Sequence, residues 1–178
     1  MEKNKNYKFG CFLKKYINFA IIITLFHSLL VLSKNPKIIL TIDSKENNVR
    51  IFDNAFKSFP LEVYLDDKKL CYNNNICFYD GQIHNFPIGV HKVTLIWERS
   101  LNNCCFMFCN AKDIISVNLS DFDTSTVTNM THMFFNCNKL TSIDVSTFNT
   151  QLVTDMKNMF EQCSSLESLD LRNLIHLK

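Results

Sequence analysis

The chain has 178 residues, a formal net charge of +2, and only three glycines and three prolines. So small a charge, spread over scattered lysines, excludes the basic patch typical of nucleic-acid-binding proteins, so no nucleic-acid partner is predicted. With so few glycines there is no Gly-rich phosphate-binding loop, and Asp80-Gly81 is interpreted as a turn.

Residues 1–33 have the pattern of an export signal. A lysine-rich stretch precedes an apolar run from Ile17 to Leu32, which is shorter than the about 20 residues needed to span a bilayer. A signal peptide cleaved after Ser33 is favoured, and an uncleaved signal anchor is the alternative and the only membrane attachment expected. The predicted localisation is therefore secreted or cell surface.

Residues 34–100 have the alternation of short β-strands. Strands are predicted at 37–43, 49–52, 61–65, 70–72 and 90–97. This pattern indicates a small β-rich N-terminal domain, a sheet or a sandwich. The residues do not indicate what the domain binds, and we expect it to cap the segment that follows.

Residues 101–178 repeat with a period of 26, giving units at 101–126, 127–152 and 153–178. Columns of matching residues include Met107, Met133 and Met159, then Phe108, Phe134 and Phe160, and then Leu119, Val145 and Leu171. The methionines and cysteines of these columns are interpreted as packing residues.

Each unit is predicted to contain a short helix and a strand. The helix is expected from the spacing of Val153, Met156, Met159, Phe160 and Cys163, which would share one apolar face. Leu169 and Leu171 would lie on one side of the strand. The predicted fold class is therefore an α/β repeat: a short leucine-rich-repeat solenoid of three 26-residue units, preceded by the small β-rich domain.

The repeats resemble a known family. The stretch Val127-Thr128-Asn129-Met130-x-x-Met133-Phe134-x-x-Cys137-x-x-Leu140 and its copy from Val153 are similar to the BspA-type leucine-rich repeat. The resemblance implies an extracellular surface protein, often an adhesin, with no known catalytic residues. Members usually carry more repeats, and the third unit here loses the expected Phe-Asp-Thr. A truncated structural repeat fragment without binding activity is therefore the alternative.

A ligand-binding role would use the outward positions of the three predicted strands. These candidates are Ser116, Asn118, Ser142, Asp144, Ser146, Ser168, Asp170 and Arg172, with Ser120 beside them. The expected partner is a protein or glycan on another cell or in the matrix. Because three units give a narrow face without Trp or Tyr, a solvated surface is the competing interpretation, and any single-site binding is predicted to be weak and strengthened by clustering.

Few other residues suggest chemistry. Cys71 and Cys77 flank a run of asparagines and are a candidate disulfide, and Asn118 and Asn129 begin N-glycosylation sequons. No catalytic motif and no metal-ligand spacing is found, so the protein is predicted to be neither an enzyme nor a cofactor- or metal-binding protein.

Overall fold

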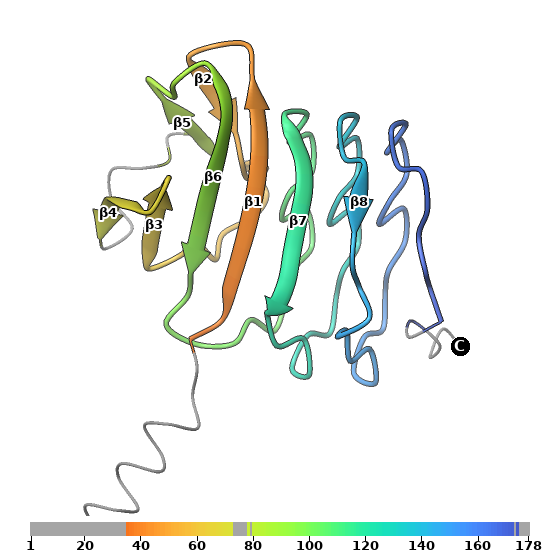
Figure 1. The fold of residues 1–178 in the computed structure, drawn as a ribbon. Helices are drawn as coiled ribbons and strands as arrows, with labels where there is room; N and C mark the ends of the chain where they lie inside the picture. The colour runs from red at the N-terminus through yellow and green to blue at the C-terminus, as the bar shows by residue number, and fades with distance from the viewer. Residues whose placement is uncertain (1–34, 73–77, 79, 173, 175–178) are drawn as a thin grey trace, which may run out of the picture. The chain divides into compact units, whose positions relative to one another are not determined.

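The computed structural model describes residues 35–72, 78, 80–172 and 174, and these residues form eight β-strands and no helix (Figure 1). The predicted signal segment, residues 1–33, lies outside the described residues. Within the described part, no helix is long and apolar enough to cross a membrane.

Six strands form one sheet in the order β4-β3-β6-β1-β7-β8. Its strands are β1 (Lys37–Ser44), β3 (Glu62–Leu65), β4 (Lys68–Tyr72), β6 (Gly89–Ile96), β7 (Ile114–Asp121) and β8 (Ser142–Ile143). The central strand β1 alternates strictly, and Ile38, Leu40 and Ile42 are completely buried on its inner side. Such alternation is typical of a sheet with one face on the core, and β1, β3, β4 and β6 overlap four of the strands predicted for residues 34–100.

The sheet crosses from the β-rich segment into the repeats. Strand β1 pairs antiparallel with β6 on one side and with β7 of the first repeat unit on the other. Strand β8 then continues the sheet in parallel with β7. The two regions also share one cluster of buried hydrophobic residues, from Ile38 to Leu174.

A second, two-stranded sheet pairs β2 (Asn48–Arg50) with β5 (Gln82–His84). Gly81 precedes β5 with a φ of +74°, and its carbonyl accepts hydrogen bonds from the backbone NH groups of Ile51 and Phe52. A Cβ at this position would lie 1.9 Å from the Phe52 carbonyl oxygen. Only glycine therefore fits this turn.

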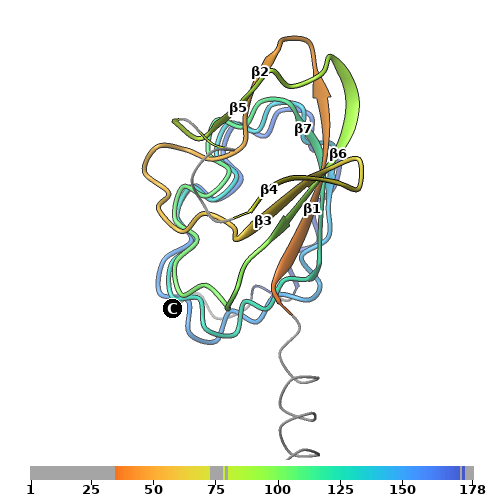
Figure 2. The same ribbon diagram turned by 90° about the vertical axis from the view of Figure 1, so that its left-hand side faces the viewer.

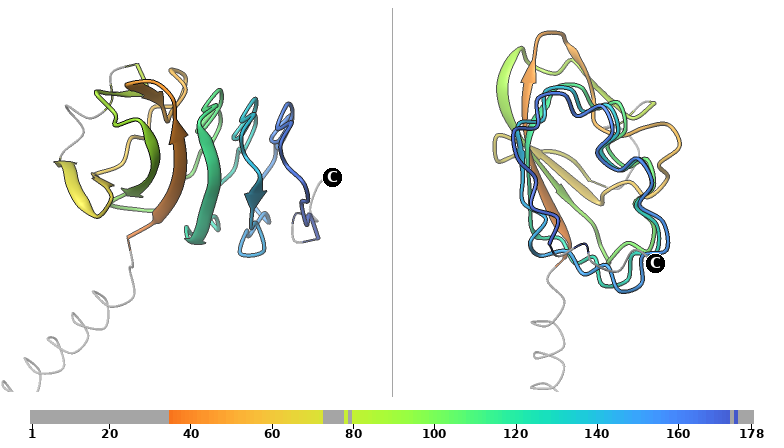
Figure 3. Two further views of the ribbon diagram at one scale, coloured as in Figure 1. Left: turned by 45° about the horizontal axis from the view of Figure 1, so that its top comes forward. Right: turned by 90° about the vertical axis from the view of Figure 1, so that its right-hand side faces the viewer.

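The repeats stack as successive turns of chain, which superpose when viewed along the stack (Figure 3, right). Backbone NH groups of Cys104, Phe106, Phe108 and Asn110 donate to carbonyls 25 residues ahead, at 2.8–2.9 Å. Met130, His132, Phe134 and Asn136 repeat this pattern toward the third unit, at 2.8–3.0 Å. Equivalent NH groups 26 residues apart therefore form equivalent hydrogen bonds to the next unit.

The predicted helices do not form. In the segments expected to be helical, every second NH donates to the next unit, while the NH groups between them, such as that of Met107, donate three residues back. Left-handed residues also recur at two positions of each unit: Phe106, Asn110, His132, Asn136, Asn158 and Gln162. A residue with positive φ ends any right-handed helical turn.

The predicted strands also shorten along the repeats. Strand β7 has eight residues, β8 has two, and the described residues of the third unit contain no strand. Leu171, expected to point inward from a strand, is 50 % exposed. The prediction of an α/β leucine-rich-repeat solenoid is therefore wrong: the described chain is a β-rich sheet fold without helices.

An aromatic column joins the regions through the core. Phe52 of the β-rich segment stacks on Phe108, which stacks on Phe134, which stacks on Phe160, with ring centroids 5.8, 5.4 and 5.4 Å apart. Viewed from the β-rich end, the segment lies across the first repeat unit (Figure 2). The β-rich segment therefore covers one end of the stacked units.

Candidate functional site

The most extensive candidate binding surface is the solvent-facing side of the six-stranded sheet, here called the outer face. Because side chains alternate along strands, burying Leu40, Val93 and Val117 turns their neighbours outward. The outer face comprises Glu62 and Tyr64 on β3, Lys92, Thr94 and Ile96 on β6, Lys37, Ile39 and Thr41 on β1, Ser116, Asn118 and Ser120 on β7, and Ser142 on β8.

Strand register brings residues distant in sequence into rows across this face. Tyr64 is opposite Thr94, Thr94 opposite Ile39, and Ile39 opposite Asn118. A neighbouring row runs from Lys92 through Thr41 and Ser116 to Ser142. In that row the Ser116 hydroxyl donates to Thr41 Oγ1 at 2.9 Å.

The outer face is wider than the repeats alone suggested. Its six strands contain 35 residues in all, each covering about 3.3 Å along the strand and about 4.8 Å across the sheet. The sheet therefore covers about 550 Å², about two-thirds of the roughly 800 Å² that each partner contributes to a standard protein interface. The face also contains a half-buried tyrosine, Tyr64, whose hydroxyl donates to Glu62 Oε2 at 2.7 Å. Sequence analysis missed this extension because β1–β7 pairing joins residues about 75 positions apart.

A hollow of about 440 Å³ lies at the repeat end of the outer face. Its polar lining includes Asn118, Ser120, Ser142, Asp144 and Ser168, with Thr147 beside them. The hollow falls where the sheet ends, since β8 has only two residues and the third unit continues without a strand. Hydroxyls, a carboxamide and a carboxylate together suit a hydrogen-bonding or cationic group.

The predicted ligand-face residues are thus distributed unequally. Asn118, Ser142, Asp144 and Ser168 line the hollow. Ser116 lies beside it on β7 and is half-buried against Thr41. Ser146, Asp170 and Arg172 are exposed but do not line it.

Local hydrogen bonds keep two carboxylates near this end ionised. Hydrogen bonds from the side chain and backbone NH of Ser146 lower the pKa of Asp144. The Arg172 guanidinium and backbone NH lower the pKa of Asp170 to about 2. Both groups carry negative charge at neutral pH, but Arg172 offsets that of Asp170, so at this end of the face Asp144 is the carboxylate that favours a basic partner group.

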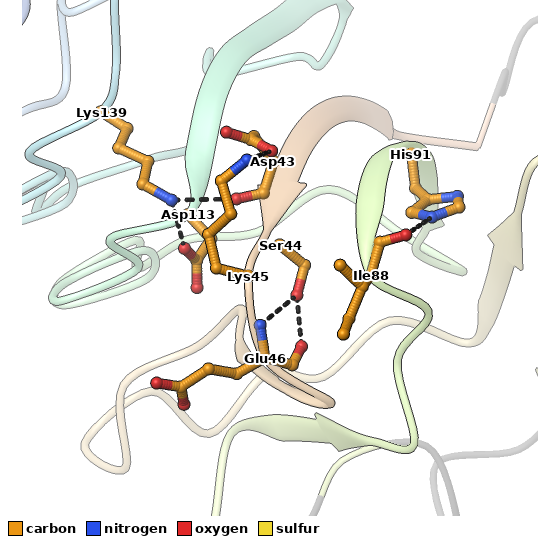
Figure 4. Close-up of polar contacts among 8 residues, drawn as sticks. All are labelled: Asp43, Ser44, Lys45, Glu46, Ile88, His91, Asp113 and Lys139. Carbon is orange, nitrogen blue, oxygen red and sulfur yellow. Dashed lines mark hydrogen bonds and ion pairs between the residues drawn. The ribbon is translucent and has the colours of Figure 1, made fainter.

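Lys139 forms hydrogen bonds that connect β1 to the repeats at one edge of the sheet (Figure 4). Lys139 of the second unit donates to the Asp43 carbonyl at 2.9 Å and to Asp113 Oδ1 at 2.8 Å. Asp43 lies in β1 and Asp113 just before β7, and the Asp43 NH donates to the Asp113 carbonyl at 2.9 Å. These bonds tie the end of β1 to two repeat units and so hold the outer face in one register.

The cysteines of the described repeats have no activated thiol. Cys104, Cys105, Cys109, Cys137 and Cys163 are free, and burial raises the pKa of each, to about 12 for Cys104 and about 11 for Cys109. The Cys137 and Cys163 thiols donate to the carbonyls of Phe108 and Phe134, each at 3.1 Å. These two cysteines therefore pack between units as hydrogen-bond donors.

The structure shows where some other predicted features lie, but it does not test their roles. Among the described residues no three His, Cys, Asp or Glu side chains converge as a metal site. Cys77 lies outside the described residues, so the Cys71–Cys77 disulfide stays a prediction. Asn118 is exposed on β7, whereas Asn129 is half-buried and forms backbone bridges with Asn103 and Asp155.

The fold and the face together define a β-rich protein with tandem 26-residue repeats. A family model described as "Mycoplasma protein of unknown function, DUF285" matches residues 84–174, just over half of the chain, and the protein belongs to this family. The match is compatible with the resemblance to BspA-like proteins noted from the repeats. No curated protein and no solved structure matches the chain.

Proposed function

We propose that the protein is a non-catalytic interaction module, displayed outside the cell, that binds a protein partner through its outer face. The observation that carries the proposal is the continuity of this face across β1 and β7, which gives it about two-thirds of the area that each partner contributes to a standard interface. The resemblance of the repeats to BspA-like surface proteins and the lysine-rich, apolar N-terminus support display outside the cell.

The composition of the face supports a protein partner. Ile39 and Tyr64 supply apolar and aromatic area in the row through Thr94, and Ile96 adds apolar area at the end of β6; buried tyrosines are among the residues that supply most of the energy at protein interfaces. The charged end near Asp144 would accept a basic side chain. A contact built on small polar groups and one tyrosine is expected to be weak singly and to gain strength by clustering.

Exposure on the cell is tested first by treating intact source cells with protease and following the full chain by mass spectrometry. The proposal expects the described part of the chain to be cleaved or released while cytoplasmic proteins stay intact. A chain degraded only after lysis contradicts display.

Binding is tested with the full chain coupled to beads at high density and added to candidate host cells or matrix. Bead binding is expected to exceed that of the soluble chain, and Ile39→Glu, which places a charge at the centre of the face, is expected to reduce it at least tenfold. Ile88→Glu is the matched control, because Ile88 is 65 % exposed outside the face. Equal binding by both variants, or no gain on beads, contradicts the proposal.

A further inference from the structure

A recess of about 830 Å³, here called the loop recess, lies where the β-rich segment meets the first repeat unit. Its walls come from the loop before β3, at residues 57–61, from the loop after β6, at residues 97–102, and from Thr126 of the first unit. None of these residues belongs to the outer face. A recess of this volume has the size of a small-ligand site.

Hydrogen bonds hold the walls of the loop recess in place. The Trp97 indole NH donates to the Ser58 carbonyl at 2.6 Å and so connects the two loops. Thr126 Oγ1 donates to the Leu101 carbonyl at 2.9 Å and so connects the second loop to the first repeat unit. Because the walls are already ordered, a ligand that enters the recess loses little free energy to ordering them.

Two cations line the loop recess without a carboxylate partner from the chain. Of the three arginines of the sequence, Arg50 and Arg172 donate side-chain hydrogen bonds within the chain. The exposed Arg99 forms no hydrogen bond and no ion pair with any described residue. Lys57 donates to the Asn54 carbonyl and forms no ion pair within the described part of the chain. A guanidinium with free donors suits a carboxylate or a sulfate, which it can bind through two parallel hydrogen bonds.

The other lining residues restrict the chemistry of the ligand. Ser58 and Ser100 have hydroxyls without a hydrogen-bond partner among the described residues, and the exposed Glu98 carboxylate can accept hydrogen bonds. Phe59 is half-buried, and its ring is held edge-on to Phe52 with centroids 5.7 Å apart, so it supplies an apolar wall. Glu98 disfavours a ligand with several negative charges. The lining therefore fits a ligand with one anionic group, several hydroxyls and an apolar face.

A sugar that carries one carboxylate or one sulfate has all three of these properties. We propose that the loop recess binds such an acidic saccharide, with its anionic group on Arg99 and Lys57. The sugar hydroxyls donate to Glu98 and exchange hydrogen bonds with the two serines, while the C–H face of the ring packs on Phe59. The inference goes beyond the proposed function, because it adds a glycan site at a surface separate from the outer face.

Ligand-observed NMR titration of the full chain tests the proposal with two acidic sugars and their neutral counterparts. The carboxylate probe is 3′-sialyllactose, compared with lactose, and the sulfate probe is galactose 6-sulfate, compared with galactose. At least one acidic sugar is expected to bind with a Kd of about 5 mM or below, at least tenfold more tightly than its counterpart. The probe that binds identifies the anionic group. No binding of either probe at about 20 mM, or equal binding of the neutral sugars, overturns the proposal.

Variants of the full chain locate the binding. Arg99→Gln is expected to weaken binding of the acidic sugar at least tenfold, and Lys57→Gln at least threefold. Lys112→Gln is the matched control, because Lys112 is an exposed cation outside the loop recess, and it is expected to stay within twofold. Arg99 is exposed, so its variant is expected to fold, which melting by circular dichroism verifies. Unchanged affinity in a folded Arg99→Gln chain, or an equal loss in Lys112→Gln, overturns the proposal.

Competition experiments separate the acidic saccharide from other anions. Sodium sulfate that displaces the sugar at equal concentration would show a simple anion site, and a blocked Gly-Asp-Gly peptide that binds as tightly would assign the recess to an acidic peptide. Either result overturns the inference. Ile39→Glu lies on the outer face and is expected to leave sugar binding unchanged, so failure of the proposed function and failure of this inference are distinguishable.

Discussion

The β-rich segment and the repeats share one sheet, but their backbone NH groups form hydrogen bonds in different patterns. In residues 37–96 the strands pair with one another in long antiparallel registers, as β1 does with β6 over eight residues. In residues 101–174 most inter-unit bonds come from turns, with every second NH reaching the next unit. The comparison shows that one hydrophobic core can be enclosed by continuous strands at one end and by stacked turns at the other.

The largest expected effect tests whether stacking between units stabilises the turns. Phe134→Ala removes a completely buried ring from between Phe108 and Phe160 and is expected to lower the free energy of unfolding by about 3–5 kcal/mol. Phe160→Ala makes the same change at the half-buried end of the column and is expected to cost about half as much. Urea unfolding measures both values, and equal losses would mean that position in the stack does not matter.

In the β-rich segment the sensitive position is a backbone turn. Gly81→Ala places a Cβ against the Phe52 carbonyl in a left-handed conformation, with an expected loss of about 2–3 kcal/mol. Gly89→Ala is the control, because the nearest atom to its added Cβ is His91 Nε2 at 3.6 Å. It retains an unfavourable φ but meets no backbone, so a smaller loss is expected. Equal melting temperatures of Gly81→Ala and Gly89→Ala would contradict the expected clash at Gly81.

A smaller effect, the difference in stability between two variants of Asn136, distinguishes stacked turns from helices by its sign. Asn136 has a φ of +59°, so Asn136→Gly is expected to be more stable than Asn136→Ala by about 1 kcal/mol. In a helix the order would reverse by about the same amount, because alanine favours helix over glycine. Both variants lose the hydrogen bond from Asn136 Nδ2 to Asn110 Oδ1, so their difference isolates the backbone. Chemical denaturation of the pair gives the sign.

The smallest effect concerns pH and the β3–β4 turn. The hydrogen bond to Asp66, 2.7 Å from His91 Nδ1, raises the pKa of His91, and Lys92 also contacts Asp66 through its backbone NH. A raised histidine pKa stabilises the fold fully below the unfolded value of about 6.5 and progressively less as pH rises through the folded value. Wild type is therefore expected to exceed His91→Gln in melting temperature at pH 6, with the gap narrowing by pH 8. A gap that does not change with pH would contradict this account.

The sequence predicted the 26-residue register and five of the six strands in residues 37–96, but not β5. Alternation is unambiguous where one face is buried, as at Ile38, Leu40 and Ile42. The helices were wrong because a three-residue spacing of apolar residues suits both conformations. Met130, Met133 and Cys137 point inward as a helix would place them, yet the Met130 NH donates to the next unit and the NH groups of Met133 and Cys137 donate three residues back. The left-handed asparagines at 110, 136 and 158 were the available signal, since asparagine tolerates that conformation.

The candidate site was predicted only in part. Asn118, Ser142, Asp144 and Ser168 were identified from the strand pattern of the repeats, and they line one hollow. Ile39, Thr94 and Tyr64 were not, because no local pattern shows that β1 pairs with β7. Long-range pairing therefore decided the width of the outer face, and with it the choice between a solvated surface and a binding surface.

The outer face acts as one surface only if the β-rich segment and the repeats fold as one unit. Trp97, the only tryptophan of the chain, contacts Phe52 and Phe122 where the two regions meet. Its fluorescence during urea unfolding, compared between wild type and Phe134→Ala, tests this directly. Our account predicts that the distant Phe134→Ala change shifts the Trp97 transition together with the far-UV transition. A Trp97 transition that stays in place while the far-UV signal shifts would show two independent domains and contradict a continuous face.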